Sequence, residues 1–238
     1  MVLFQLDVTR FFQIYVVQGI ICAYFLYLIV KIFKRNKKRL NLILSGFYIF
    51  GIMSLTLNFI YAPLTNEFIV RILYFFTIYL LLFSTTFLVL FALVLLKSDV
   101  IIDTKKQILI VLAYAVGFLT PFIFYDQGGV TINASTDWKP VWSWPFFIYV
   151  LVLTGGITLA PILFYSTKIY HKLQEEKIKK KWKYYVIGIL GIFIFTYGTL
   201  LSNTINIQTF RTVWSFIALF LVIVAPYMIY YGVGKQIG

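Results

Sequence analysis

The stretch Ile69–Leu96, IVRILYFFTIYLLLFSTTFLVLFALVLL, decides the fold class of this chain. It contains a single charged residue, Arg71, and consists mainly of Leu, Phe, Ile and Val. A helix needs about 20 consecutive, mostly apolar residues to cross the hydrocarbon core of a bilayer. The stretch exceeds that length, so it predicts a transmembrane helix.

Similar apolar stretches recur along the chain. Lipid offers no partners for backbone polar groups, and these stretches lack the alternating pattern of barrel strands, so all of them should be helices. The sequence therefore predicts an all-α membrane protein, a bundle of seven transmembrane helices forming a single domain over residues 1–238. The expected spans are Phe11–Phe33, Leu42–Ala62, Ile69–Leu96, Ile108–Tyr125, Phe146–Thr167, Tyr184–Asn203 and Val213–Tyr231.

The overall composition agrees with this fold class. The 238 residues are 61% hydrophobic and 12% charged, whereas an ordinary soluble domain is about 45–50% apolar and about 25% charged. The net charge of +13 would suggest a nucleic-acid partner only if a folded soluble domain presented a basic face. No polar connection is long enough to build such a domain, so we expect no nucleic-acid partner.

The distribution of basic residues predicts the orientation. If the N-terminus lies outside, 17 of the 21 lysines and arginines fall on the inner side of the membrane. Only Arg10, Arg71, Lys139 and Arg211 remain on the outer side. Inner connections are enriched in Lys and Arg, so we expect the N-terminus outside and the C-terminus inside.

The predicted membrane interior contains no carboxylate or imidazole. All eight acidic residues and the only histidine, His171, lie in connections or termini. Ion-coupled transporters usually need an ionisable group at membrane depth, and hydrolytic enzymes need an acid, a base or a nucleophile. Cys22 is the only cysteine, so a cysteine metal cluster is excluded. We therefore expect no enzymatic activity, no cofactor and no metal site.

Uncharged polar residues lie mainly in the outer halves of the predicted helices. Under one hypothesis they line a shallow cavity that opens to the outside and hydrogen-bonds a small ligand. Under the alternative they hold neighbouring helices together, as Ser, Thr, Asn and Gln commonly do in membranes. The candidate ligand-binding residues, including one from the outer connection, are Gln18, Asn58, Tyr61, Trp138, Thr199, Ser202, Asn203 and Ser215.

The connection between the fifth and sixth helices, Lys168–Tyr185, is rich in lysine. It should extend both helices beyond the bilayer and attract anionic headgroups of the inner leaflet. A sharper hypothesis makes it a docking surface for a separate, acidic cytoplasmic partner. The candidate residues for lipid or partner binding are Lys172, Lys177, Lys179, Lys180, Lys181 and Lys183.

The outer connection between the fourth and fifth helices contains the stretch Val130–Trp144, VTINASTDWKPVWSW. Asn133 begins an Asn-x-Ser sequon, so it is a candidate glycosylation site. Trp142 and Trp144 precede the fifth helix and match an aromatic belt at the membrane interface. Trp138 lies further from the helix, and we expect it to fold the loop back as a lid over the helix ends.

These features together resemble the seven-helix architecture of membrane receptors and sensors. The resemblance rests on the seven spans, the lysine-rich connection and Pro226 in the last helix, VAPYMIYY. The third helix ends in LLKSDV rather than the triplet of G-protein-coupled receptors, and the seventh lacks the lysine that binds retinal in microbial rhodopsins. The general likeness is to the seven-helix sensory regions of prokaryotic signalling proteins.

The resemblance implies a receptor-like sensor in the plasma membrane of a prokaryote. Such a sensor would bind a small ligand from outside and signal through its basic inner face to a separate protein. Two alternatives remain open at this stage. One is an accessory or scaffold subunit of a larger membrane complex, and the other is a facilitator for an uncharged small solute.

Overall fold

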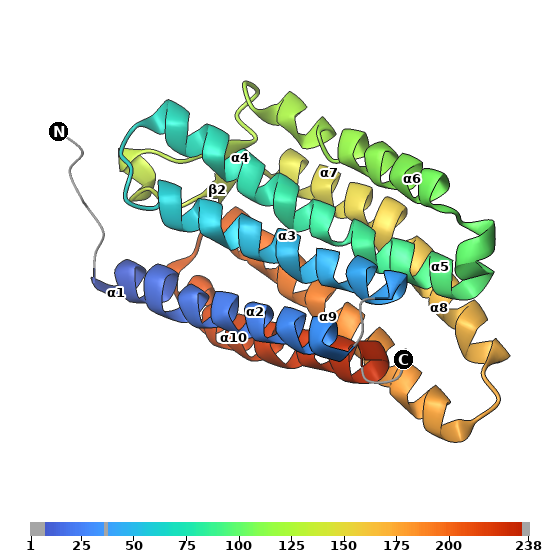
Figure 1. The fold of residues 1–238 in the computed structure, drawn as a ribbon. Coiled ribbons are helices and arrows are strands. Elements are labelled where there is room, and N and C mark those ends of the chain that lie inside the picture. The colour runs from blue at the N-terminus through green and yellow to red at the C-terminus, as the bar shows by residue number, and fades with distance from the viewer. Residues whose placement is uncertain (1–7, 36–37, 235–238) are drawn as a thin grey trace.

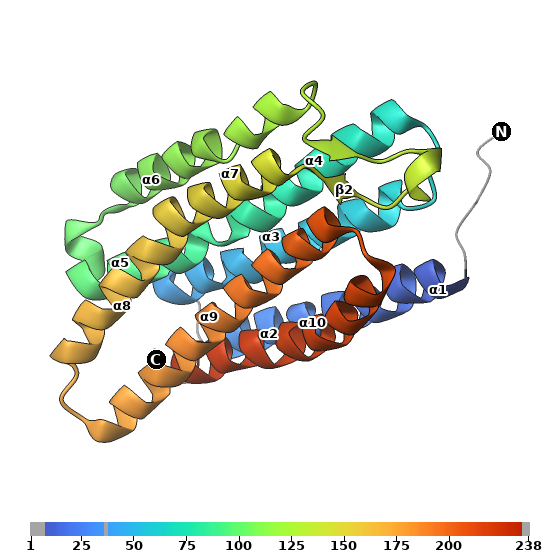
Figure 2. The ribbon, with the colours of Figure 1, turned by 180° about the vertical axis from the view of Figure 1, so that it is seen from behind.

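A computed structural model describes residues 8–35 and 38–234 of the chain. The described residues form seven helices that are long and apolar enough to cross a membrane, which confirms the predicted number of spans. They lie side by side in one elongated bundle (Figures 1 and 2). The spans are Ile14–Lys34, Arg39–Tyr61, Glu67–Lys97, Thr104–Phe124, Trp144–Lys172, Glu176–Ile205 and Gln208–Val233.

Several spans combine more than one helical element. The only strands in the described ranges are two short segments in the connection after the fourth span. The elements are α1 (Val8–Phe11), η1 (Phe12–Val17), α2 (Gln18–Arg35), α3 (Arg39–Tyr61), α4 (Glu67–Ser84), α5 (Thr86–Ile101), α6 (Thr104–Gly117), η2 (Thr120–Phe124), β1 (Val130–Thr131), η3 (Ala134–Thr136), β2 (Val141–Trp142), α7 (Trp144–Thr154), η4 (Gly155–Leu159), α8 (Ala160–Lys172), α9 (Glu176–Ile205), α10 (Gln208–Ile229) and η5 (Tyr230–Gly234).

The connection between the fifth and sixth spans is much shorter than the polar sequence around it. Helix α8 continues to Lys172 and helix α9 begins at Glu176. This agrees with the expectation that both helices extend past their apolar parts. The turn between them is therefore residues 173–175, and the lysines lie on helix rather than in a loose loop.

The third span is the centre of the bundle. In its most apolar window 67% of the residues are buried, against 17% in the fourth span. Helices α3 and α8 both pack against α5. A helix that is apolar on all sides is typically buried on all sides, which fits the mostly apolar sequence of this span.

The buried apolar side chains form two clusters along the length of the bundle. One cluster contains Phe83 and Phe146 together with the connection after the fourth span. The other contains Leu88 and Ile162 and extends to the opposite end. Partly buried side chains, including Tyr114, pack against both clusters.

The two clusters meet where the third and fifth spans are irregular. Helix α4 ends at Ser84, and the hydroxyl of Thr85 donates to the carbonyl of Leu82 at 2.6 Å. In the fifth span, η4 is a π-helix, so the N–H of Ala160 bonds to the carbonyl of Gly155, five residues earlier. Such single-turn π segments are uncommon and often occur at functional sites.

Candidate functional sites at the two ends of the bundle

The connection after the fourth span closes one end of the bundle. We call residues 125–143 the cap, the end that it covers the cap end, and the opposite end the basic end. Strands β1 and β2 pair antiparallel inside the cap, with Val130 opposite Trp142. Val130 and Ile132 are buried in the cluster at the cap end. The cap is therefore part of the packed structure rather than a loose loop.

Trp142 is the deepest anchor of the cap. Only 3% of its surface is exposed, and its indole N–H donates to the hydroxyl of Tyr74 at 2.6 Å. Its ring also lies 4.5 Å from that of Phe146. The prediction that Trp142 is an interface anchor is wrong, because strand pairing turns this ring inward, where Tyr74 satisfies its N–H. Trp144 is 54% exposed, as an interfacial residue would be.

Arginine side chains from two other spans hold the cap in place. Arg10 donates to the carbonyls of Asp137 and Trp138, at 3.1 and 2.8 Å. Arg211 donates to the carbonyl of Pro140 at 2.8 Å. Hydrogen bonds from charged donors are stronger than neutral ones. The first and last spans are thus tied to the same loop.

Trp138 itself is half-buried and packs against the cluster at the cap end. Its backbone has φ of 57°, and that of Asp137 has φ of 50°. Residues other than glycine seldom adopt this left-handed region. Trp138 thus lies in a bend of the cap, and its role as a lid over the helix ends stays a prediction.

Three of the predicted polar candidates, Asn203, Tyr61 and Ser202, lie at the cap end of the bundle. Asn203 lies near the hydroxyl of Tyr74, the group that accepts from Trp142. Tyr61 is buried, with its ring 6.0 Å from that of Tyr74. Ser202 is buried as well. Tyr74, which the sequence analysis missed, therefore connects Asn203, Tyr61 and Trp142 from three parts of the chain.

The other polar candidates within the spans are bonded elsewhere. The amide of Asn58 donates to the side-chain oxygen of Gln18 at 2.8 Å, which links the first two spans. Thr199 accepts from the indole of Trp214 at 3.1 Å. The hydroxyl of Ser215 donates to the carbonyl one turn earlier at 2.8 Å. These contacts support the helix-packing alternative, and the ligand-binding role of these residues stays a prediction.

Arg211 is a second functional candidate that the sequence analysis did not select. It is half-buried, and its Nε has no hydrogen-bond partner among the described residues. One signal was present in the sequence, since basic residues are scarce on the predicted outer side and Arg211 is one of them. The positive-inside rule does not account for a basic residue there.

Asn133 organises the tip of the cap. Its side-chain oxygen accepts from both the N–H and the hydroxyl of Ser135, at 3.0 and 2.7 Å, and thereby caps η3. Ser135 is exposed. These contacts give the Asn133 side chain a structural role, and its glycosylation stays a prediction.

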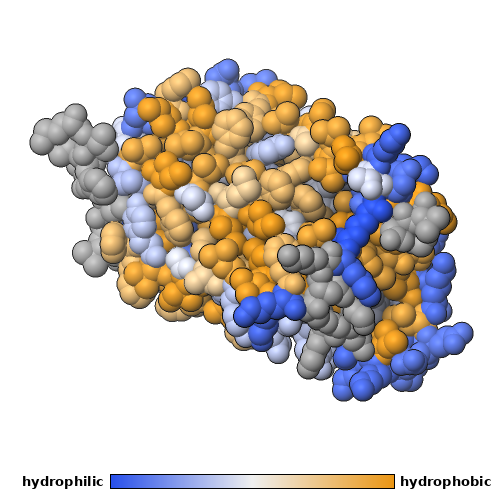
Figure 3. All heavy atoms as spheres, in the orientation of Figure 1, coloured by the Kyte–Doolittle hydropathy of each residue, from blue (hydrophilic) through white to orange (hydrophobic). Residues whose placement is uncertain are grey.

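The basic end is built around the hairpin of α8 and α9, which projects past the neighbouring helices (Figure 1). The amine of Lys179 pairs with Glu176 at 2.8 Å, and that of Lys183 lies 5.6 Å from the ring centre of Tyr170. Figure 3 shows hydrophilic side chains gathered at this end and apolar ones across the middle. The remaining candidate lysines of this hairpin are Lys172, Lys177, Lys180 and Lys181.

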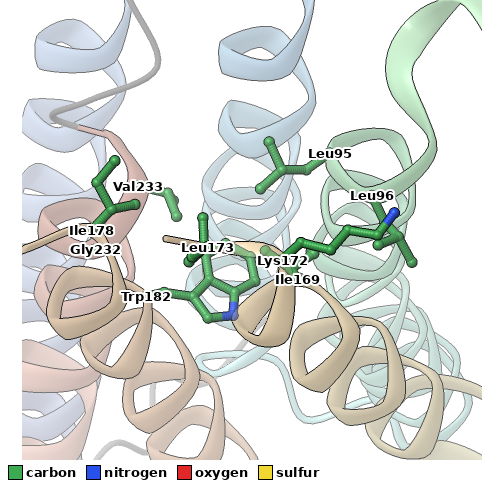
Figure 4. A pocket seen from close by; sticks show the side chains of 9 residues that line it. All are labelled: Leu95, Leu96, Ile169, Lys172, Leu173, Ile178, Trp182, Gly232 and Val233. Atoms are coloured by element: carbon green, nitrogen blue, oxygen red, sulfur yellow. The ribbon is translucent and has the colours of Figure 1, made fainter. Parts of the chain in front are cut away.

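An apolar cavity of about 320 Å³ lies at the base of this hairpin (Figure 4). Its walls come from the ends of α5, α8, α9 and η5. Among the described residues that line the cavity, Lys172 is the only charged one. The lining residues are Leu95, Leu96, Ile169, Lys172, Leu173, Ile178, Trp182, Gly232 and Val233.

Among the described residues, no group of three His, Cys, Asp or Glu side chains could hold a metal ion. The arrangement is that of a helical bundle with seven helices long enough and apolar enough to span a membrane, a cap at one end and a basic hairpin at the other. No protein-family model matches the chain, and a search of curated proteins finds no significant match. Its function is therefore inferred from the geometry of the two ends.

Proposed function

We propose that this protein is a non-enzymatic, receptor-like sensor of a prokaryotic plasma membrane. The cap faces outside and responds to a small ligand, and the basic hairpin of α8 and α9 faces the cytoplasm and signals to a separate protein. One observation carries the proposal. The third and fifth spans both run from the capped cluster to the basic end, and both are irregular where the two clusters meet.

The orientation is supported by the charges at the two ends. The hairpin contains Lys172, Lys177, Lys180 and their neighbours, whereas the cap contains one lysine, Lys139, which lies 3.8 Å from Asp137. Lysine and arginine are retained preferentially on the cytoplasmic side of a membrane. The cap is accordingly the end that meets molecules from outside.

The input would act through the hydrogen bonds beneath the cap. Tyr74, Asn203 and Trp142 form a small polar group inside an apolar cluster. A ligand with hydrogen-bonding groups that replaces the indole N–H of Trp142 would bind the displaced form of the cap better than the closed one. A ligand shifts a conformational equilibrium only by its difference in affinity for the two states. Displacing the cap would also require free energy to break the hydrogen bonds from Arg10 and Arg211 to its carbonyls.

The coupling between the two ends can be measured with a pair of spin labels. Cysteines placed at Gln174, in the hairpin turn, and at Lys105, at the start of α6, report the position of the hairpin in a Cys22→Ser background. We expect Trp142→Ala to shift the distance distribution between the labels. Trp144→Ala, which removes an exposed indole two residues away, should leave it unchanged.

Trp142→Phe is the control for a loss of folding in Trp142→Ala. It keeps an aromatic ring in the cluster and removes only the N–H that Tyr74 accepts. A smaller shift in the same direction as for Trp142→Ala supports the proposal. Identical distributions for the parent and both Trp142 variants would mean that the cap does not influence the hairpin, and the sensor proposal would fail.

An accessory subunit is the second candidate, and one observation favours it. Helix α10 leaves Phe216 and Phe220 exposed over 73% and 65% of their surfaces, so this face is covered by lipid or by another membrane protein. Purification in mild detergent distinguishes the two. A stoichiometric membrane partner would support the subunit and would contradict a sensor that works on its own.

A further inference from the structure

In the part of the chain that the structure describes, the cavity at the basic end combines an apolar interior with one charged group at its rim, the amine of Lys172. Leu95, Leu173 and Val233 are among its apolar walls, and the side chain of Lys172 extends toward Leu96 (Figure 4). The volume of about 320 Å³ falls at the lower end of the range for small-molecule sites, about 300–1,000 Å³. An occupant must therefore be largely apolar and carry a negative charge at one end.

The depth of the cavity indicates where such a molecule would come from. Leu96 directly precedes Lys97, and Ile169 directly follows Lys168, whose amine lies 4.2 Å from the ring centre of Phe164. Trp182 lines the cavity and donates to the carbonyl of Ser166. Tryptophan and lysine at the ends of transmembrane helices mark the headgroup level. The cavity thus lies where phospholipids surround the protein.

We propose that this cavity is a specific site for an anionic phospholipid of the inner leaflet. One acyl chain enters between α5 and the hairpin and contacts Leu95, Leu173 and Trp182. The phosphate lies at the amine of Lys172. This goes beyond a general attraction of the basic hairpin to the membrane, because one lysine and one apolar cavity define the site.

The local charges fit this occupant. Lys172 is exposed, and Lys97 and Lys177 flank lining residues in the chain. The nearest acids in sequence are Glu175 and Glu176, and Glu176 is paired with Lys179 at 2.8 Å. A soluble protein segment would have to pass the headgroup layer to reach the same apolar walls, whereas a phospholipid is already present at that depth. The observations therefore favour lipid over a protein segment.

Native mass spectrometry of the full chain in mild detergent tests the proposal. Phosphatidylglycerol and phosphatidylcholine with the same acyl chains are added in turn, and the bound lipid is counted. We expect one tightly bound phosphatidylglycerol and weaker binding of phosphatidylcholine. Lys172→Gln should weaken phosphatidylglycerol binding by at least about fivefold, whereas Lys180→Gln, the same charge change outside the cavity, should leave it nearly unchanged.

A cavity-filling variant distinguishes lipid binding in the cavity from nonspecific attraction of lipid to the basic surface. Leu173→Trp should weaken the binding of both lipids because it occupies the space of the acyl chain. Equal losses for Lys172→Gln and Lys180→Gln would show diffuse electrostatics and overturn the proposal. Unchanged binding in both Lys172→Gln and Leu173→Trp would also overturn it. The inference goes beyond the proposed function, since lipid binding is measured directly and is independent of coupling to the cap.

Discussion

Replacing Trp142 tests whether the cap is an integral part of the bundle. Trp142→Ala removes an indole that is 3% exposed and leaves a space beside Phe146. Truncating a buried Phe or Trp to Ala typically costs about 3–5 kcal/mol of stability. The variant also removes the donor to the Tyr74 hydroxyl. A hydrogen bond within a protein typically contributes about 1 kcal/mol net, so we add about that amount for its loss.

Two companion variants divide this effect into its parts. Trp142→Phe keeps most of the packing and should cost about 1–2 kcal/mol, mainly from the lost hydrogen bond. Trp144→Ala removes an indole that is 54% exposed, and a surface change of this kind usually alters stability by about 0.5 kcal/mol or less. The expected order of stability is therefore Trp144→Ala, then Trp142→Phe, then Trp142→Ala.

The assay is unfolding of the purified proteins in one detergent, followed by near-ultraviolet circular dichroism. Heating midpoints establish the order, and titration with a denaturing detergent gives the differences in free energy of unfolding. Equal midpoints for Trp142→Ala and Trp144→Ala would refute the reasoning. In that case the buried indole of Trp142 would contribute no more to stability than the exposed indole of Trp144.

Two further predictions concern helix packing and orientation. Gly188→Ala would place a Cβ 2.7 Å from a backbone oxygen of α10, so we expect a loss of about 1–3 kcal/mol in the same unfolding assay. Gly156→Ala, with nothing within 4 Å of the added Cβ, should be close to neutral, and equal losses would contradict the packing of α9 on α10. Single cysteines at Ser135 and Lys180, in a Cys22→Ser background, should react with impermeant reagents from opposite sides of the membrane. Reaction of both cysteines from the same side would contradict the proposal that the cap and the basic hairpin lie on opposite sides of the membrane.

The seven spans could be predicted because lipid imposes a simple length requirement on apolar helices. The same requirement does not predict where a helix becomes irregular inside an apolar span. The break at Thr85 lies inside the third span. The π turn of the fifth span begins at Gly155, the first residue of a Gly-Gly pair. At the break, the carbonyls of Leu81 and Leu82 accept from the hydroxyls of Ser84 and Thr85, whereas in the π turn the carbonyl of Ile157 accepts from Tyr114 of the fourth span. The position of the fourth span beside the π turn cannot be read from the sequence. That information is tertiary, so the division into two clusters could not be found in the sequence.

Among the candidate functional residues, those that differ in polarity from their neighbours in the sequence could be predicted, and the others could not. Residues that stand out against their surroundings, such as Asn58 and Asn203 in apolar helices, were identified. Tyr74 was missed because a tyrosine in an aromatic-rich helix has no such contrast. Trp142 was assigned to the interface from its position before a helix, whereas the pairing of β1 with β2 decides its direction.

The irregular part of the fifth span shows how the two ends could influence each other. Tyr114 donates its hydroxyl to the carbonyl of Ile157 in the π turn, at 2.5 Å, and Thr154 donates to the hydroxyl of Tyr197 at 3.1 Å. These bonds connect the fourth and sixth spans to the one place where the fifth departs from an α-helix. In a regular α-helix the carbonyl of Ile157 would accept from the N–H four residues later, whereas here it accepts from Tyr114 of the fourth span. Under the proposed function, this turn between the two clusters is the place where displacement of the cap would reach the hairpin.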